Sequence, residues 1–434
     1  MTGEDVLELH IHGGQATVKA VLSAIPHASL TFPIRYAEPG EFTRRAFQNN
    51  RLDLAQVEAL SDTLSAETEQ QRRVAVRGNS GSLGRTYEQW RQQLLYARGE
   101  LEALIDFSED QHFDESPTEL LASVTTQVEL MLKSIAQHET GSQRGELLKR
   151  GIRISLLGPP NAGKSSLLNQ VVGREASIVS QEAGTTRDIV EVSLDIRGYL
   201  CIFADTAGLR TRVKGGQTAE AGAHSVIGAV EQEGIRRAKA KARESDVIIA
   251  LASVEPSDNT PDNWTIQFDT ETLAIASQAP QCMVVINKCD SVTPELLSRL
   301  LADFRARTAN IFAREAGMIT ISCRDAQRKM PSEDPGNIHH LVNQLAGLFS
   351  DMTTLPSDLV DLLGVTERQR QLLSHCSESL LAYIDESSPS ESGREPDIVL
   401  AAEHLRSAAN CLARITGRGE AGDVEEVLGV VFEK

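Results

Sequence analysis

The sequence predicts a mixed α/β fold that is flanked by helical segments on both sides along the chain. Short apolar runs such as Ile152 to Leu157 end in polar or glycine-containing motifs, as parallel strands do at their carboxyl ends. Leucines recur at helical spacing before residue 150 and after residue 355. Only 4% of the 434 residues are aromatic, which suits helices and a parallel sheet better than an all-β fold.

The first segment has the period of a strand. Apolar and polar residues alternate from Val6 to His12, which predicts a strand with one apolar face. His10 and His12 share a face of that strand, but without a nearby third ligand the pair favours solvent exposure or hydrogen bonding over a metal site. From about residue 43 to residue 150 the pattern becomes helical, with a break from Gly78 to Gly84. The acidic stretch from Asp106 to Glu115 indicates a solvated loop, with a docking face for a basic partner as the alternative.

A glycine-containing loop follows the first apolar run of the α/β segment. Gly158 to Ser165 reads Gly-Pro-Pro-Asn-Ala-Gly-Lys-Ser and leads into the helix-like stretch Ser166 to Val172. Backbone N–H groups at such a turn bind a β-phosphate, while Lys164 supplies a positive charge and the Ser165 hydroxyl suits Mg²⁺. The predicted phosphate contacts are Asn161, Ala162, Gly163, Lys164, Ser165 and Ser166. The loop predicts binding of a nucleoside triphosphate.

Two further motifs complete the predicted phosphate end of the site. Asp205-Thr206-Ala207-Gly208 ends the apolar run Leu200 to Ala204, so Asp205 can reach Mg²⁺ through water and Gly208 can approach the γ-phosphate. Thr206 and Ala207 are predicted nucleotide contacts in the same motif. Gly184 to Asp188 reads Gly-Thr-Thr-Arg-Asp, and its Thr186 is the predicted second protein ligand of Mg²⁺.

Asn287-Lys288-Cys289-Asp290, after the apolar run Met283 to Ile286, predicts which base is bound. The Asp290 carboxylate can accept hydrogen bonds from both N1–H and the exocyclic amine of guanine, a pair of donors that adenine lacks. Ser322 and Cys323, in a short loop after another apolar run, are predicted to contact the base as well. These motifs predict GTP rather than ATP as the ligand.

Leu209 stands where a Ras-like enzyme carries the glutamine that positions water, so hydrolysis requires another residue. At this point the chain resembles the MnmE (also called TrmE) family of tRNA-modification GTPases, which carries all four nucleotide motifs, the third continuing as Leu209-Arg210. Flanking signatures extend the resemblance nearly from end to end. They are residues 2–9, 12–14, 39–43, 45–47, 52–56, 58–59, 415–418, 423–424 and 427–429.

The resemblance implies a catalytic arrangement that uses a potassium ion. In the family this ion is bound partly by the asparagine of the phosphate loop, here Asn161, and by carbonyl groups of a loop that corresponds to Ser180 to Ala183. The predicted K⁺ contacts are Asn161, Ser180, Glu182 and Thr185. Glu231, in a Val-Glu-Gln-Glu-Gly-Ile stretch, is the predicted residue that orients the attacking water, and a solvated helical glutamate is the alternative. Arg187 and Asp188 are the other predicted catalytic residues.

The resemblance also implies a domain arrangement. An α/β P-loop GTPase domain (148–348) is expected as an insertion into an all-α helical domain (51–147 and 349–434), preceded by a remnant of an α+β folate-binding-type domain (1–50). Relatives carry sequence before Thr2 and a Cys-x-Gly-Lys ending beyond Lys434, so both ends are expected to be incomplete. Binding of a formyl-tetrahydrofolate-type donor and formation of the homodimer of full-length relatives are therefore left open.

For function, the resemblance implies a K⁺-dependent GTP hydrolase that works with an FAD-containing MnmG (GidA)-like partner. Together they would install a carboxymethylaminomethyl-type group at carbon 5 of the wobble uridine in tRNA. A GTP-controlled binding switch that regulates an assembly without modification chemistry is the alternative. The segment at residues 211–229 is longer than the second switch of bacterial family members, which favours a mitochondrial matrix protein over a bacterial cytoplasmic one.

Composition limits the remaining choices. The formal net charge of −18 argues against unaided nonspecific binding of nucleic acid, so contact with tRNA is expected through the complex with the partner. Six cysteines without zinc-like spacing indicate reduced thiols in the core. No apolar run is long enough to span a membrane. The polar segment from Glu255 to Asn263 is interpreted as a disordered loop without function.

Overall fold

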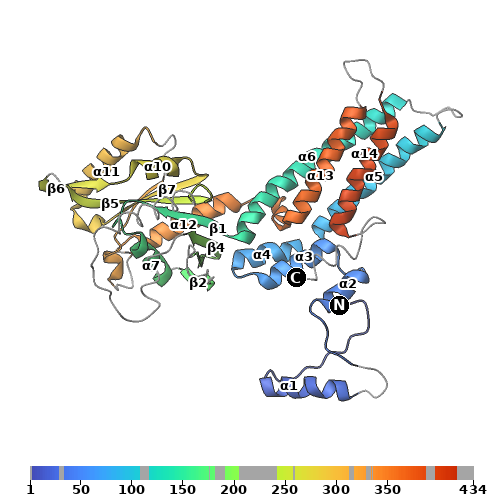
Figure 1. The fold of residues 1–434 in the computed structure, drawn as a ribbon, viewed down its shortest axis with the longest axis horizontal. Coiled ribbons are helices and arrows are strands. Elements are labelled where there is room, and N and C mark those ends of the chain that lie inside the picture. Colours follow the sequence, from blue (N-terminus) through green and yellow to red (C-terminus); the bar gives the residue numbers. More distant parts are fainter. Residues whose placement is uncertain are drawn as a thin grey trace, which may run out of the picture. The chain divides into compact units, whose positions relative to one another are not determined.

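The computed structural model divides the chain into two compact units, each of which is described by itself (Figure 1). The helical unit consists of Met1–Ser65, Val74–Gly145 and Leu355–Lys434, and the sheet unit consists of Ala66–Arg73 and Glu146–Thr354. The structure describes residues 2–28, 34–107, 117–174, 176–180, 191–204, 242–257, 260–311, 317–328, 334, 336–387 and 396–417.

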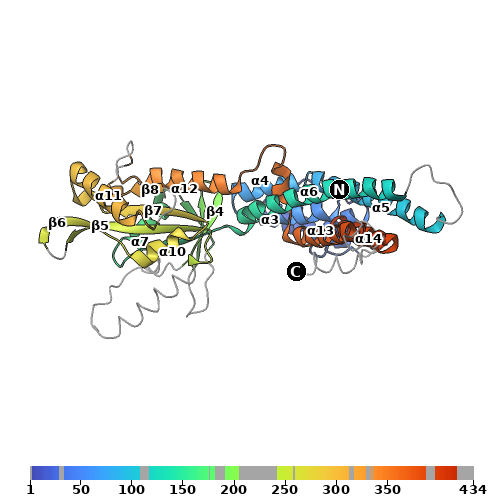
Figure 2. The ribbon, with the colours of Figure 1, turned by 90° about the horizontal axis from the view of Figure 1, so that it is seen from above.

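The sheet unit contains a mixed sheet with helices on both of its sides (Figure 2). Its described strands follow the order β2-β3-β4-β1-β5-β7-β8, and β6 pairs with β5. The central pairs β4-β1, β1-β5, β5-β7 and β7-β8 are parallel, whereas β2-β3, β3-β4 and β5-β6 are antiparallel. The strands are β1 (Ile152–Leu157), β2 (Ala176–Ser180), β3 (Val192–Ile196), β4 (Tyr199–Ala204), β5 (Val247–Ser257), β6 (Thr260–Gln267), β7 (Gln281–Asn287) and β8 (Gly317–Thr320). The helices are α7 (Lys164–Arg174), α10 (Thr270–Ser277), η2 (Cys289–Ser291), α11 (Pro294–Thr308), η3 (Asp325–Gln327) and α12 (Ile338–Thr353).

The central strand β5 explains why this part of the sequence is so continuously apolar. Residues Val247 to Val254 are all buried. Ile249 and Leu251 belong to a cluster with residues of α7 and α12, whereas Ile248 and Ala250 belong to a cluster with residues of α10 and α11. Because successive side chains of a strand point to opposite faces, helices must cover both faces of the sheet. The predicted α/β fold with a mostly parallel central sheet is confirmed.

β5 is longer than the apolar pattern predicts. The strand continues to Ser257, β6 begins at Thr260, and the two pair with Glu255 opposite Thr265. The interpretation of Glu255 to Asn263 as a disordered loop is therefore wrong for its described residues. Backbone hydrogen bonds of a hairpin order this polar stretch, and such bonds leave little trace in a hydrophobic pattern.

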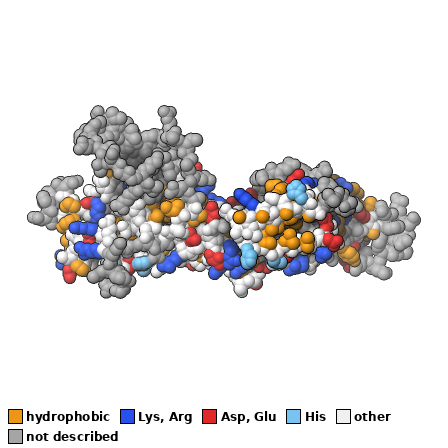
Figure 3. All heavy atoms as spheres, turned by 90° about the horizontal axis from the view of Figure 1, so that it is seen from below, with side chains coloured by type: hydrophobic (Ala, Val, Ile, Leu, Met, Phe, Trp, Pro, Cys, Tyr) orange, Lys and Arg blue, Asp and Glu red, His pale blue; other side chains and the backbone are white. Residues whose placement is uncertain are grey.

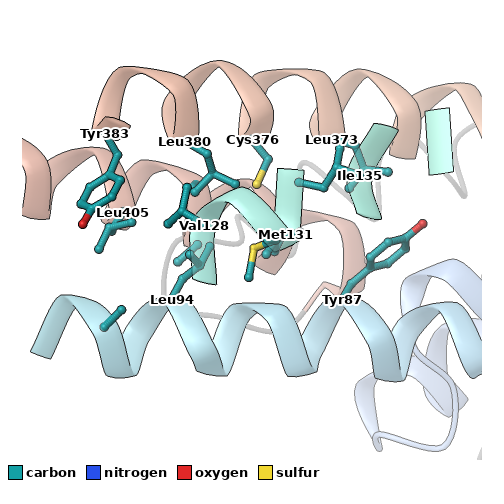
Figure 4. Packing of buried hydrophobic residues seen from close by; sticks show 14 of the residues in the cluster. Tyr87, Leu94, Val128, Met131, Ile135, Leu373, Cys376, Leu380, Tyr383 and Leu405 are labelled. Carbon is teal, nitrogen blue, oxygen red and sulfur yellow. The ribbon is translucent and has the colours of Figure 1, made fainter. Parts of the chain in front are cut away.

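In the helical unit, helices from before and after the sheet unit share one core. Buried residues of α5 and α6 pack in a single cluster with those of α13 and α14. Figure 4 labels Tyr87, Leu94, Val128, Met131, Ile135, Leu373, Cys376, Leu380, Tyr383 and Leu405 of this cluster. The predicted insertion of the α/β part into a helical part is therefore confirmed. The helices are α1 (Gln15–Ala24), η1 (Ile25–His27), α2 (Glu41–Gln48), α3 (Leu54–Ser65), α4 (Glu69–Gly78), α5 (Ser82–Phe107), α6 (Pro117–Arg150), η4 (Val360–Gly364), α13 (Glu367–Ser387) and α14 (Ile398–Thr416), with α4 and α6 continuing into the residue ranges of the sheet unit.

Arg368 connects three segments of the helical unit. Its guanidinium donates to the carboxylate of Glu58 on α3 and to the backbone carbonyls of Arg414 (3.0 Å) and Ile415 (3.2 Å) in the last turn of α14. Gln369 also donates to Glu58, at 2.7 Å. The last carbonyls of a helix have no partner within the helix, so a guanidinium that satisfies two of them stabilises the end of α14.

The predicted N-terminal strand is absent among the described residues. Residues 5–14 form neither helix nor strand, and the side chains of Leu7, Leu9 and Ile11 are exposed. Alternation alone does not form a strand, because the backbone also needs a neighbouring strand to pair with. Exposed large hydrophobic residues are most numerous in the N-terminal part of the chain, among the residues that the structure describes. Figure 3 shows that hydrophobic side chains gather in one area of the surface.

Two glycines allow α6 to approach η4 closely. A Cβ atom added to Gly145 would lie 2.1 Å from the backbone oxygen of Leu363, and one added to Gly141 would lie 2.5 Å from Cβ of Leu362. Neither distance is possible for real atoms, and a backbone oxygen cannot move aside as the end of a flexible side chain can. The contact between these segments therefore requires glycine at position 145.

We expect Gly145→Ala to destabilise the helical unit by about 1–3 kcal/mol, although alanine is the better helix former, because the added methyl group overpacks the contact. Thermal unfolding followed by circular dichroism measures the change. Gly99→Ala is the matched control, since Gly99 lies within α5 with open space around it. This control should gain roughly 0.5–1 kcal/mol. Equal midpoints for the two variants would contradict the close approach.

Candidate nucleotide site

The loop from Gly158 to Lys164 connects β1 to α7 at the carboxyl edge of the parallel strands. Gly163 has φ +98°, and a Cβ atom there would lie 2.1 Å from Nδ2 of Asn287, so only glycine fits. Asn161 also has positive φ, at +61°, and its side chain is exposed. The loop turns directly into the N-terminus of α7, whose first N–H groups are free of helix partners and favour an anion.

Lys164 follows the turn of this loop and is the first residue of α7. Its Nζ donates to the backbone oxygens of Gly158 at 2.8 Å and Pro159 at 2.9 Å. The ammonium group is therefore directed toward the loop backbone, where the predicted phosphate position lies, and it is partly buried. The side chains of Ser165 and Ser166, in the first turn of α7, are exposed. The structure thus brings together the predicted phosphate contacts that it describes.

Asn287, the last residue of β7, joins the phosphate loop to the predicted base pocket. The residue is 2% exposed. Nδ2 donates to the backbone oxygen of Ala162 at 2.9 Å, while Oδ1 accepts from the backbone N–H of Cys323 at 3.2 Å and of Lys288 at 2.8 Å. The donor and the acceptor of one buried amide therefore connect segments separated by more than a hundred residues. Sequence reasoning placed Asn287 in the site, and the structure adds this connecting role.

Asp290 lies in η2, just beyond Asn287, and its carboxylate is positioned by the loop after β8. Oδ1 accepts from the Ser322 hydroxyl at 2.8 Å, and Oδ2 is 3.9 Å from the Arg324 guanidinium. The Ser322 oxygen in turn accepts from the backbone N–H of Asp325 at 3.0 Å. The carboxylate is thus oriented through one oxygen, which leaves acceptor capacity at the other for ligand donors.

Two cysteines near this carboxylate carry protonated thiols. Burial raises the pKa of Cys289 and of Cys323 to about 11 in each case, and the nearby Asp290 charge acts in the same direction. Both are thiols at neutral pH, and the predicted role of Cys323 rests on its backbone. All six cysteines are free, in agreement with the prediction of reduced thiols.

Glu255 is a residue of this region that sequence reasoning missed. Its carboxylate accepts hydrogen bonds from the Lys288 ammonium and from the Ser253 hydroxyl, the latter at 3.0 Å. No motif contains Glu255, and its place beside Lys288 depends on the extension of β5 beyond the pair Ser253–Asn287, where the β5–β7 ladder ends.

The switch motifs lie outside the described residues. This applies to Glu182, Thr185, Thr186, Arg187, Asp188, Asp205, Thr206, Ala207, Gly208 and Glu231. Ser180 ends β2, but nothing is described of its side chain. In the part of the chain that the structure describes, no group of three or more His, Cys, Asp or Glu residues could bind a metal ion, and no helix has the length and apolar character needed to cross a membrane.

A phosphate loop after β1 and an Asn-Lys-Cys-Asp motif after β7, at the same edge of a mostly parallel sheet, define a P-loop GTPase. Two family models account for nearly all of the chain: "MnmE helical domain" matches residues 54–434, and "GTP-binding protein TrmE N-terminus" matches residues 1–51. The chain belongs to the MnmE (TrmE) family of tRNA-modification GTPases.

Individual relatives agree with this assignment. The tRNA modification GTPase MnmE of Parvibaculum lavamentivorans is 38% identical over 431 residues, which are 99% of this chain and 82% of that protein. The human mitochondrial 5-taurinomethyluridine-tRNA synthase subunit GTPB3 is 34% identical, over 100% of this chain and 77% of that protein. The mitochondrial tRNA modification GTPase mss1 of Schizosaccharomyces pombe is 35% identical, over 100% and 80%. Relatives thus occur both in bacteria and in mitochondria.

We expect Asn287→Asp to weaken GTP binding by roughly 10- to 100-fold. The variant retains an acceptor for the N–H of Cys323 but places a carboxylate oxygen against the carbonyl of Ala162, and a buried polar group without a partner costs about 1–3 kcal/mol. Titration with a fluorescent guanine nucleotide measures the loss. Asn310→Asp, the same change at an exposed turn of the sheet unit, is the control and should bind like the unchanged protein. Equal affinities of both variants would show that Asn287 does not connect the two halves of the site.

Proposed function

We propose that this chain couples GTP hydrolysis to the modification of carbon 5 of the wobble uridine in tRNA, together with an FAD-containing MnmG-like partner. The observation that supports this most is the match to the MnmE family over nearly the entire chain, flanking helices included. A GTPase of another class would share the nucleotide motifs but not these flanks. Flavin and a one-carbon donor would supply the redox and carbon chemistry, so the contribution of this chain is the conformational cycle of a GTPase.

In the proposed site, the phosphates lie on the loop from Gly158 to Ser165. Lys164 offers its charge to the β- and γ-phosphate oxygens, and the exposed hydroxyl of Ser165 can bind Mg²⁺ together with Thr186 and, through water, Asp205. At the other end, the Asp290 carboxylate accepts the two guanine donors, and the backbone of Cys323 borders the base. The tight turn at Gly163 fits this assignment, because a side chain there would collide with Nδ2 of Asn287, which donates to the phosphate loop.

We further propose that hydrolysis depends on K⁺. Leu209 offers no group that could orient water, so another residue must do so. Hydrolysis also requires a positive charge that stabilises the transition state at the phosphates. A bound K⁺ would neutralise charge that develops between the β- and γ-phosphates. Asn161 suits such an ion, since its side chain is exposed on the phosphate loop, and Ser180, Glu182 and Thr185 are the other proposed contacts. Glu231 is the proposed residue that orients the water, with Arg187 and Asp188 in supporting catalytic roles.

Replacement of K⁺ by Na⁺ should lower GTP turnover strongly while GTP affinity changes little, because charge stabilisation at this position contributes on the order of 10³–10⁵ in rate in related GTPases. Phosphate release measured in KCl and in NaCl of equal ionic strength tests this. Glu231→Ala should abolish turnover in both salts, whereas Glu233→Ala, which removes a neighbouring charge, should not. Equal rates in the two salts would refute the K⁺ proposal, and an active Glu231→Ala variant would refute that residue's role.

Three parts of the proposal rest on the family alone. The division into domains at residues 1–50, 51–147, 148–348 and 349–434 is one of them. Binding of a formyl-tetrahydrofolate-type donor by the N-terminal segment and homodimer formation are the others. The net charge of −18 favours contact with tRNA through the basic surface of the partner complex.

Nucleoside analysis of tRNA distinguishes the proposed function from a binding switch that performs no modification. Cells that lack the protein should lose the carbon-5 substituent of wobble uridine in the affected tRNAs, and the unchanged gene should restore it. A variant with Lys164→Ala should fail to restore it, since the phosphate loop would lack its charge. Unchanged wobble uridines in the deletion strain would favour the switch.

A further inference from the structure

Glu255 lies where β5 leaves the parallel ladder and enters the hairpin with β6. Ser253 is the last residue of β5 to pair with β7, opposite Asn287, and Glu255 pairs with Thr265 of β6. Residues two apart on a strand point to the same face, so Ser253 and Glu255 project together. The hydrogen bond of 3.0 Å from the Ser253 hydroxyl to Oε1 of Glu255 agrees with this geometry.

The same carboxylate oxygen accepts a hydrogen bond from the ammonium of Lys288. The two side chains are 24% and 34% exposed, so solvent screens this ion pair only in part. The backbone of Lys288 has a left-handed conformation, with φ +64°. Lys288 directly follows Asn287 and stands two residues before Asp290. Both ends of the Lys288 side chain are therefore fixed, the backbone end by the turn and the ammonium end by Glu255.

We propose that Glu255 is a positioning residue for the guanine nucleotide and that it acts through Lys288. This inference rests on the proposed GTP site. A lysine side chain has four flexible methylene groups, and ordering them costs conformational entropy whenever a ligand packs against them. Because Glu255 orders Lys288 in advance, the methylene groups form a preformed apolar edge beside the Asp290 carboxylate, and a flat purine ring can pack there without that cost.

The position of the pair determines which measurements should change. Glu255 lies beyond the β5–β7 ladder, on the side of the base motif, and its carboxylate accepts hydrogen bonds from Ser253 and Lys288. GTP and GDP carry the same base, so removal of the carboxylate should weaken both equally. The rate constant for hydrolysis at saturating GTP should not change, since Glu255 lies outside the proposed catalytic groups.

A double-mutant cycle with the full chain tests the proposal. Glu255→Gln retains the shape of the side chain but removes its charge, and it should weaken GTP and GDP alike by about 5- to 20-fold, the range expected for a partly buried charge-assisted hydrogen bond. Lys288→Met should weaken binding as well, and adding Glu255→Gln to it should cause no further loss. Glu244→Gln, at an exposed turn of the same unit, removes the same charge and should leave affinity unchanged.

The outcomes separate this inference from the proposed function. Unchanged affinity in Glu255→Gln, or an equal additional loss in the Lys288→Met background, would overturn the positioning role while GTP binding by the unchanged protein stands. A loss for GTP alone, with unchanged GDP affinity, would also overturn it, because the effect would then lie at the γ-phosphate. Failure of the unchanged protein to bind guanine nucleotides would instead refute the proposed function. Thermal unfolding of each variant shows whether a loss of affinity merely reflects unfolding.

Discussion

The buried amide of Asn287 is the constraint on which the candidate site depends. A primary amide carries its donor and its acceptor on two separate atoms, and here the nitrogen donates to the phosphate loop while the oxygen accepts from the loop after β8. The geometry of both loops is consequently set by one side chain at the end of one strand. The glycine at position 163 is part of the same constraint, since Nδ2 of Asn287 occupies the space that a Cβ atom would need.

A second layer of polar contacts surrounds the base end of the site. Ser322 orients Asp290 through one carboxylate oxygen, and Glu255 orients Lys288 through its ammonium group. In both cases a partner from another segment of the chain fixes a side chain that the ligand would otherwise have to order. Preorganisation of this kind contributes to affinity without any new contact to the ligand, because the entropy of ordering is lost during folding rather than during binding.

The sequence predicted those features that depend on local pattern. β1 and the loop after it were predictable because a mostly apolar run, a glycine-containing turn and a helix start follow one another without interruption. The shared core of α5, α6, α13 and α14 followed from leucine spacing on both sides of the α/β segment together with the family resemblance. The strand expected from Val6 to His12 did not form in the described residues, since alternation states which face is apolar but not whether a partner strand exists. Glu255 and the contact of Gly145 with Leu363 were unpredictable for a related reason: each depends on the register of segments that are distant in the chain.

The shared helical core has a consequence for synthesis on the ribosome. α5 and α6 are translated early, yet their apolar faces pack against α13 and α14, which emerge only after the whole sheet unit. At typical elongation rates this delay lasts on the order of 10 to 40 seconds, whereas isolated helices form within microseconds. The apolar faces of α5 and α6 are therefore exposed on the nascent chain while the sheet unit folds. A chaperone that binds hydrophobic surface would act mainly during this interval.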